Sequence, residues 1–249
     1  MITIKNLCVV FNEHTAIEKT ALKNINLTIK ESDFVTVIGG NGAGKSTLMN
    51  TLAGETRQSQ GEILVENEDV SHLTTEKRAR YVSRVFQDPL TGCFANMTVA
   101  ENLALAYGIN QQLSFKLALT KQKQCLLKDK LVALGVGLEK RLQDKMGLLS
   151  GGQRQAVSLM MATVRPSKIL LLDEHTAALD PKMADTVMQI TERLIKEYAL
   201  TTLMVTHSMV QALQFGNRML VMQEGQIVQD LSCERKKLLK PVDLIHYFK

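Results

Sequence analysis

The chain has 249 residues, of which 45% are hydrophobic and 22% charged, and its formal net charge at pH 7 is +5. This composition is typical of one large globular domain over residues 1–249 and argues against a disordered or fibrous protein. We expect no signal peptide, because the N-terminus runs directly into alternating residues, and no apolar run approaches the roughly 18 residues of a membrane span.

The basic and sulfur-containing residues indicate no special class of protein. Basic residues are spread along the chain rather than clustered, so the net charge identifies no nucleic-acid partner. The strongest basic run, Arg235-Lys236-Lys237, is expected to be part of a solvated tail. The four cysteines lie far apart without a C-x-x-C pair, which predicts free thiols in a reducing cytoplasm.

Strand patterns dominate the first 86 residues. Alternating or continuous apolar residues predict strands over residues 2–10, 22–29, 34–38, 61–65 and 81–86. A helix is predicted over residues 47–53, ended by Gly54, and a short helical turn over residues 74–80. Because these strands largely lack helical crossovers, we expect an antiparallel sheet beside the core that contains the strand 34–38.

From Thr98 the pattern becomes helical. Leucines and alanines at helical spacing predict helices over residues 99–107 and 114–134, within a helical insertion that spans residues 88–163. Strands over residues 168–173 and 201–206 then alternate with helices over residues 181–198 and 208–215, and a hairpin follows over residues 217–222 and 226–230. This alternation predicts a parallel sheet with right-handed crossovers and an α/β fold.

A glycine-rich loop lies between the predicted strand 34–38 and the predicted helix 47–53. It fits the pattern G-x-x-x-x-G-K-[ST] with Gly39, Gly40, Asn41, Gly42, Ala43, Gly44, Lys45 and Ser46, followed by Thr47. Such a loop turns its N–H groups toward one anion, and the helix N-terminus adds its partial positive charge. Lys45 would reach the β- and γ-phosphates and Ser46 would ligate Mg²⁺, so the loop predicts a nucleoside triphosphate as ligand with Mg²⁺ as cofactor.

Two carboxylates follow the apolar strand 168–173. In open α/β sheets, ligands bind at the carboxyl ends of strands, so Asp173 is placed to hold Mg²⁺ through its water shell. Glu174 would orient the water that attacks the γ-phosphate or take its proton. An Asp-Glu pair after a strand can also simply begin a turn, and the glycine-rich loop favours the functional interpretation.

A second glycine turn lies about a hundred residues further along. Ser150, Gly151, Gly152 and Gln153 precede an apolar helical stretch, with Ser150 as N-cap candidate and glycine N–H groups exposed at the helix start. The residues alone fit a second anion site and an ordinary capped helix after a flexible loop equally well.

The stretch Leu149–Gln153 resembles the signature motif of the ATP-binding cassette (ABC) ATPases, and the other motifs of that family follow in order. Gln87 is similar to the Q-loop glutamine, Ala178-Leu179-Asp180 to the D-loop, and His207 to the switch histidine. Phe11 lies where an aromatic residue stacks on adenine in the family. The resemblance covers essentially the whole chain, and it implies a RecA-like P-loop NTPase core with an antiparallel β subdomain and an inserted helical subdomain.

Three positions depart from the family pattern. Phe11 replaces the commoner tyrosine but keeps the ring face that stacking needs. His175 follows Glu174 where many members carry proline, and nothing in the sequence indicates a chemical role for it. The loop begins Gly39-Gly40-Asn41, which the pattern permits.

The resemblance implies a head-to-tail dimer that traps two ATP molecules. Ser150, Gly151 and Gly152 would bind a γ-phosphate of the opposite subunit, with Gln153 beside them. Gln87 would contact Mg²⁺ and His207 the γ-phosphate, and both join Glu174 as catalytic residues. Asp180 would contact the opposite subunit at the nucleotide.

The resemblance also implies a transport function. The chain would be an ATPase subunit, peripheral at the cytoplasmic face of the cell membrane, that drives a separate integral-membrane permease. Import of a small solute such as an amino acid, with an extracytoplasmic solute-binding protein, is the leading hypothesis, and no nucleic-acid partner is expected. An exporter subunit and a non-transport clamp on DNA or ribosomes are the alternatives.

Overall fold

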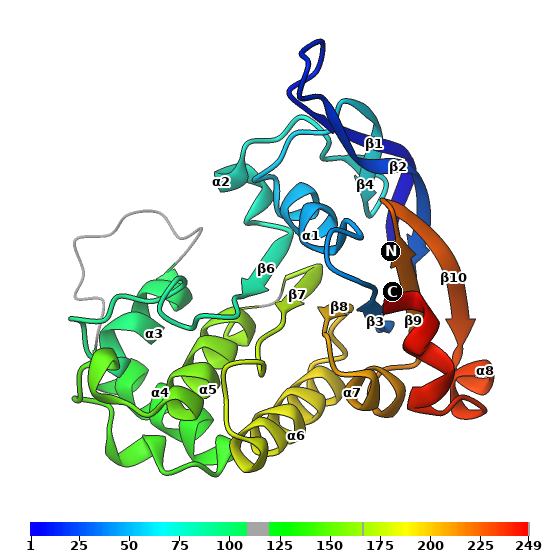
Figure 1. The fold of residues 1–249 in the computed structure, drawn as a ribbon. Helices are drawn as coiled ribbons and strands as arrows, with labels where there is room; N and C mark the ends of the chain where they lie inside the picture. The colour runs from blue at the N-terminus through cyan, green and yellow to red at the C-terminus, as the bar shows by residue number, and fades with distance from the viewer. Residues whose placement is uncertain (109–119, 166, 249) are drawn as a thin grey trace. The chain divides into compact units, whose positions relative to one another are not determined.

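The computed structural model describes residues 1–108, 120–165 and 167–248. Its backbone divides into two compact units, drawn in Figure 1. The first unit comprises Met1–Arg84, Ser167–Glu174 and Glu197–Lys249, and the second comprises Val85–Pro166 and His175–Lys196. Among the described residues, no helix combines the length and the apolar character that crossing a membrane requires.

The first unit contains an antiparallel sheet, as the sequence predicts. Its strands are β1 (Ile2–Phe11), β2 (Lys19–Ile29), β4 (Gln60–Val65) and β5 (Glu68–Asp69), in the order β2-β1-β4-β5. Alternate residues of β1 and β2 are buried, so each strand places one apolar face in the core. In β2 these are Leu22, Ile25, Leu27 and Ile29.

A second, six-stranded sheet has the order β10-β9-β3-β8-β7-β6. Its strands are β3 (Phe34–Ile38), β6 (Val82–Val85), β7 (Ile169–Asp173), β8 (Thr202–Val205), β9 (Arg218–Gln223) and β10 (Gln226–Ser232). Strand β3 is fully buried and runs parallel to β8 and β9, while β7 runs parallel to β8. The carboxyl ends of β3 and β7 therefore meet at one edge, where the glycine loop and the two acids follow them.

Strand β6 corrects one expectation. Its pattern groups it with the antiparallel strands, but it lies at the edge of the six-stranded sheet beside β7. The Tyr81 carbonyl accepts hydrogen bonds from the N–H groups of Lys168 and Ile169, at 2.8 and 3.0 Å, where β7 begins. The apolar pattern identifies a strand, but long-range pairing decides which sheet it joins.

Helix α1 (Lys45–Ala53) begins at the glycine loop and ends at Gly54, which has a left-handed φ of 80°. Arg78, in the short helix α2 (Thr75–Arg78), is 1% exposed and packs against this end. Its guanidinium donates to the carbonyls of Thr51 and Leu52, at 3.3 and 3.2 Å, and to those of Val70 and Ser71. The last carbonyls of α1 are thereby satisfied by a buried cation, which favours the negative end of a helix.

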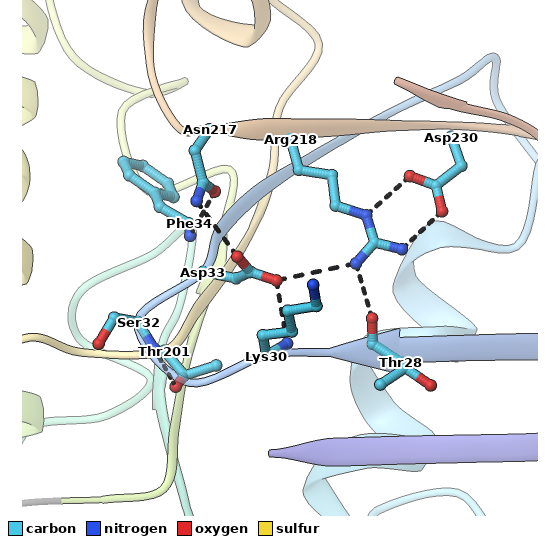
Figure 2. Close-up of polar contacts among 9 residues, drawn as sticks. All are labelled: Thr28, Lys30, Ser32, Asp33, Phe34, Thr201, Asn217, Arg218 and Asp230. Atoms are coloured by element: carbon cyan, nitrogen blue, oxygen red, sulfur yellow. Dashed lines mark hydrogen bonds and ion pairs between the residues drawn. The ribbon is translucent and has the colours of Figure 1, made fainter. Parts of the chain in front are cut away.

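A polar cluster anchors the turn between β2 and β3 (Figure 2). Arg218 of β9 donates to both carboxylate oxygens of Asp230 in β10, at 2.7 and 2.5 Å, and to the Thr28 carbonyl in β2, at 2.6 Å. Asp33 accepts from Asn217 at 3.2 Å and lies 3.8 Å from Arg218. The cluster joins the ends of strands from both sheets, and it fixes where β3 starts.

The C-terminal basic run is not a solvated tail. It forms helix α8 (Cys233–Lys237), followed by the 3₁₀ helix η3 (Pro241–Phe248). Lys236 is buried and its ammonium donates to the carbonyls of Phe215 and Gly216, just after helix α7 (Met209–Gln214). Burial lowers the pKa of Lys236 to about 8. Runs of charged residues are usually solvated, but here the packing of the folded chain buries Lys236, the middle residue of the run.

The second unit is helical. Its elements are α3 (Val99–Gly108), α4 (Lys121–Leu134), η1 (Leu138–Lys140), η2 (Met146–Leu148), α5 (Gly151–Thr163) and α6 (Pro181–Glu197). Helices α3 and α4 both pack against α5. The predicted helix 114–134 is confirmed from Lys121 onward, and residues 114–119 lie outside the described residues.

Candidate nucleotide-binding site

The glycine loop joins β3 to α1 in a backbone conformation that requires glycine. Gly39 has φ 154° and Gly44 has φ 98°, both unfavourable for residues with a side chain. A Cβ atom on Gly39 would lie 2.2 Å from the Met222 carbonyl oxygen, and one on Gly44 would lie 2.8 Å from that of Ala21. Neighbouring strands therefore hold the loop in place by direct backbone approach.

Lys45 lies in the first turn of α1 with its ammonium folded back onto the loop. Its Nζ donates to the carbonyl of Gly39 at 2.8 Å and to that of Gly40 at 3.0 Å. Burial lowers the pKa of Lys45, and the negative charges of Glu174 and Asp173 partly offset this effect. The lysine and both predicted carboxylates thus lie within electrostatic reach of one another.

A cavity of about 220 Å³ opens beside the loop. It is lined by residues 41–47 together with Phe11, Lys19, Ala21, Glu174 and His207. Phe11 is 40% exposed, which leaves part of the residue accessible to a stacking partner. Lys19 was not predicted as a site residue, because it lies between the predicted strands 2–10 and 22–29, and only the cavity identifies this second cation.

Glu174 and His207 form a close pair at this cavity. Glu174 Oε1 lies 2.7 Å from His207 Nε2, and the glutamate side chain is 15% exposed. Glu174 also has a left-handed φ of 47°, which costs a residue with a side chain about 1–2 kcal/mol, while its N–H donates to the Val205 carbonyl at 3.0 Å. The backbone strain is held by the sheet and aims the carboxylate toward the histidine.

Asp173 is paired with an arginine that the sequence did not indicate. Arg84 of β6 donates from Nη2 to Asp173 Oδ2 at 2.5 Å and from Nη1 to Glu55 Oε2 at 2.8 Å. A lone arginine in a short apolar strand was the available signal, because such a charge needs a partner when it is buried.

The oxygen donors of the first unit fit Mg²⁺. Ser46 is exposed in the first turn of α1, Asp173 ends β7, and α1 packs against β7. Within the part of the chain that the structure describes, no group of three or more His, Cys, Asp or Glu side chains could hold a metal. Mg²⁺ commonly binds through one or two carboxylates plus substrate phosphates, so a single carboxylate with a hydroxyl is a suitable donor set.

The second glycine turn begins α5, and Ser150 is its N-cap, as predicted. Ser150 Oγ accepts from the N–H of Gln153 at 3.4 Å, and Gln153 Oε1 accepts from the N–H of Ser150 at 3.3 Å, which is a capping box. Arg141 also donates to Gln153 Oε1, at 2.7 Å. Gln153 is therefore engaged in the cap, while the Ser150 hydroxyl keeps a proton to donate.

A second cavity, of about 310 Å³, lies within the second unit. Gln87 lines it together with Asp88, Pro89, Gly151, Arg154, Ala178 and Leu179. The structure thus brings the Q-loop, signature and D-loop residues together. Asp180 is exposed and accepts from the N–H of Met183 at 3.1 Å, which makes it the N-cap of α6.

His175 is buried in the second unit. Its Nε2 lies 3.0 Å from Thr191 Oγ1, and that hydroxyl donates its proton to the Val187 carbonyl at 2.8 Å. The histidine must therefore donate from Nε2. Burial lowers the pKa of His175 to about 4.

We expect acid to destabilise the protein through His175. The unfolded chain takes up a proton at about pH 6.5, whereas the folded chain resists it until about pH 4, so the unfolded state binds more protons in between. The free energy of unfolding should fall by about 3 kcal/mol from this residue across that range. Chemical denaturation at several pH values should show a shallower pH dependence for His175→Gln, and parallel curves would contradict the assignment.

The fold and the glycine loop define a P-loop nucleotide-binding protein, and comparison with known proteins narrows this class. The ABC transporter family matches residues 22–177, and the chain belongs to this family. It is an ATP-binding subunit of an ABC transporter, and its enzymatic activity is ATP hydrolysis.

Two relatives and two solved structures illustrate the similarity. The tyrosine transport ATP-binding protein of Clostridioides difficile (strain R20291) is 40% identical over 248 residues, covering 100% of this chain and 98% of that protein. The spermidine/putrescine import ATP-binding protein PotA of Haemophilus ducreyi (strain 35000HP / ATCC 700724) is 35% identical over 213 residues. That match covers 86% of this chain and 54% of PotA, so the chain spans about half the length of that relative.

Both structures are of MJ0796, a bacterial ABC transporter cassette. Its dimeric structure superposes with a TM-score of 0.79 at 27% identity, covering 94% of this chain and 99% of that chain. A dimeric post-hydrolysis state bound to ADP and Pi gives a TM-score of 0.76 at 29% identity, with the same coverage.

Proposed function

We propose that this chain energises an importer for a small solute such as an amino acid, working as an ATP-dependent head-to-tail dimer. The observation that carries the ATPase part is the cavity at which Lys45, Glu174 and His207 meet. The importer part is supported by a relative named for tyrosine transport that this chain matches over 98% of its length, and by PotA, which is named for spermidine/putrescine import.

In this proposal the residues of the first unit bind and position ATP. Phe11 stacks on adenine, residues 39–47 cradle the phosphates, and Lys45 moves from its carbonyl partners onto the β- and γ-phosphates. Glu174 orients the attacking water or takes its proton, and His207 holds the γ-phosphate while keeping Glu174 in place through their 2.7 Å contact.

Mg²⁺ would be held by Ser46, Asp173 and Gln87. When bound, it neutralises charge on the β- and γ-phosphate oxygens. Asp173 is well suited because a charged partner already fixes its carboxylate.

The second unit completes the partner's site in this proposal. Residues 88–163 form the helical insertion, and Ser150, Gly151, Gly152 and Gln153 present the signature turn to the opposite subunit's γ-phosphate. The capping box supports this role, because it orients Ser150 and leaves its hydroxyl proton available for an anion. Asp180 lies near the opposite nucleotide in the dimer.

The partners follow from a transport function. We infer a separate integral-membrane permease, a location at the cytoplasmic face of the cell membrane, and an extracytoplasmic solute-binding protein in the same system. Co-purification of the tagged full-length chain from detergent-solubilised membranes of its own cells tests this. A multi-span protein should be retained, whereas recovery of ribosomes or DNA in its place would contradict transport.

The solute class needs a second measurement on the same complex. Once the permease and the binding protein are reconstituted in vesicles, ATP hydrolysis should be stimulated by an amino acid on the binding-protein side. Stimulation by a polyamine alone would overturn the amino-acid assignment and leave import intact.

A further inference from the structure

Arg84 connects two parts of the nucleotide site from a strand that the proposed mechanism does not use. Its side chain is 10% exposed, and its Asp173 partner is 17% exposed. One guanidinium nitrogen donates to Asp173 Oδ2 at 2.5 Å and the other to Glu55 Oε2 at 2.8 Å. Glu55 directly follows Gly54, which ends the helix of the glycine loop, so Arg84 links that helix to the acidic strand end.

The chemistry of the Arg84–Asp173 pair suits a cation that fixes the orientation of a metal-binding carboxylate. Arginine stays protonated in proteins, and its planar fork fixes a carboxylate better than a lysine does. Arg84 contacts one of the two oxygens of Asp173, and a carboxylate can use its second oxygen toward the water shell of Mg²⁺.

We propose that Arg84 is a positioning residue that holds the Asp173 carboxylate and, together with Glu55, sets the affinity for the divalent cation. This inference rests on the proposed role of Asp173 in holding Mg²⁺. The positive charge of Arg84 opposes the arriving cation, and Glu55 offsets part of that charge. Affinity for the metal is thereby kept moderate, which allows it to leave with the products.

The proposal predicts that substitutions of Arg84 and of Glu55 change the affinity for the divalent cation in opposite directions. Arg84→Gln removes the positive charge that contacts the Asp173 carboxylate and should tighten cation binding about tenfold. Loss of the restraint on the short Asp173 side chain should weaken cation binding only about two- to threefold. The net effect of Arg84→Gln should therefore be tighter binding. Glu55→Gln leaves Arg84 uncompensated and should weaken cation binding by about threefold to tenfold.

Mn²⁺ titration reports this affinity without turnover. The full-length chain is saturated with a non-hydrolysable ATP analogue, and free Mn²⁺ is followed by electron paramagnetic resonance. Lys168→Gln is the matched control. Lys168 pairs with Glu66 at 2.7 Å and lies just before β7 begins. This substitution therefore removes an equal positive charge at the end of β7 opposite to Asp173. Its Mn²⁺ affinity should match that of the unchanged chain.

The outcomes separate the inference from the function on which it rests. Unchanged or weaker Mn²⁺ binding in Arg84→Gln, or equal losses in Arg84→Gln and Glu55→Gln, would overturn the inference and indicate a purely structural tie. If Arg84→Gln does not fold, Glu55→Gln and the charge-preserving Arg84→Lys test the inference in its place. The Mn²⁺ affinity of Arg84→Lys should stay within about twofold of that of the unchanged chain. If the unchanged chain does not bind the analogue even with EDTA present, the proposed nucleotide site itself fails.

Discussion

Replacing Glu174 with glutamine should lower ATP turnover by about 10²–10⁴-fold, the usual contribution of a positioned base. The amide keeps the size of the side chain and an oxygen that can accept from His207, so only the basic group is lost. Nucleotide affinity should therefore remain unchanged. Single-turnover phosphate release and equilibrium ATP binding together measure the two effects.

Glu224→Gln is the matched control for this experiment. Glu224 has the same left-handed backbone, with φ 46° against 47° for Glu174, but it lies in the turn between β9 and β10. Its turnover should equal that of the unchanged chain. Turnover within about threefold of the unchanged chain in Glu174→Gln would remove Glu174 from the base role.

The same variant also tests the dimer. With hydrolysis blocked, ATP stays between the subunits, so Glu174→Gln should sediment as a persistent dimer in ATP and as a monomer in ADP. A monomer in saturating ATP, both alone and with its membrane partner, would contradict a site completed by the signature turn of a second subunit.

Replacing Lys45 with alanine should weaken ATP binding by about 10- to 100-fold, the worth of one or two hydrogen bonds to a charged group. Lys45 brings the only ammonium that the glycine motif specifies, and the variant leaves the loop glycines unchanged. Fluorescent-nucleotide titration measures the loss. Lys30→Ala, at an exposed position outside the cavity, should bind normally.

Thermal unfolding of Lys45→Ala without nucleotide shows whether weaker ATP binding reflects the lost ammonium or a loss of folded protein. Lys45 also donates to the carbonyls of Gly39 and Gly40, so its loss should lower the stability slightly. Unaltered ATP affinity in a folded Lys45→Ala chain would contradict the assignment of the loop as the phosphate cradle.

Local features of this fold could be predicted from the sequence because their causes are local. Gly54 ends α1 and Ser150 caps α5 through bonds within a few residues, and the apolar alternation that identifies β2 is a pattern of near neighbours in the sequence. The glycine loop belongs to the same group, since its conformation requires glycine wherever it occurs.

Features that depend on distant partners could not be predicted. The sheet that β6 joins, the burial of Lys236 and the pairing of Arg84 with Asp173 all involve residues far apart in the chain. His175 illustrates the same limit, because only the packed structure shows that its ring is buried against Thr191 and kept neutral by that burial. Lys19 joins the cavity for a similar reason.

The carbonyl oxygens of Gly39 and Gly40 offer the ammonium of Lys45 an alternative to phosphate oxygens within the loop itself. Once products depart, this charge has carbonyl oxygens 2.8 and 3.0 Å away to receive it, so it does not become a bare cation in a dry pocket. An incoming ATP exchanges one set of bonds for another, and the cradle need not be rebuilt at each cycle.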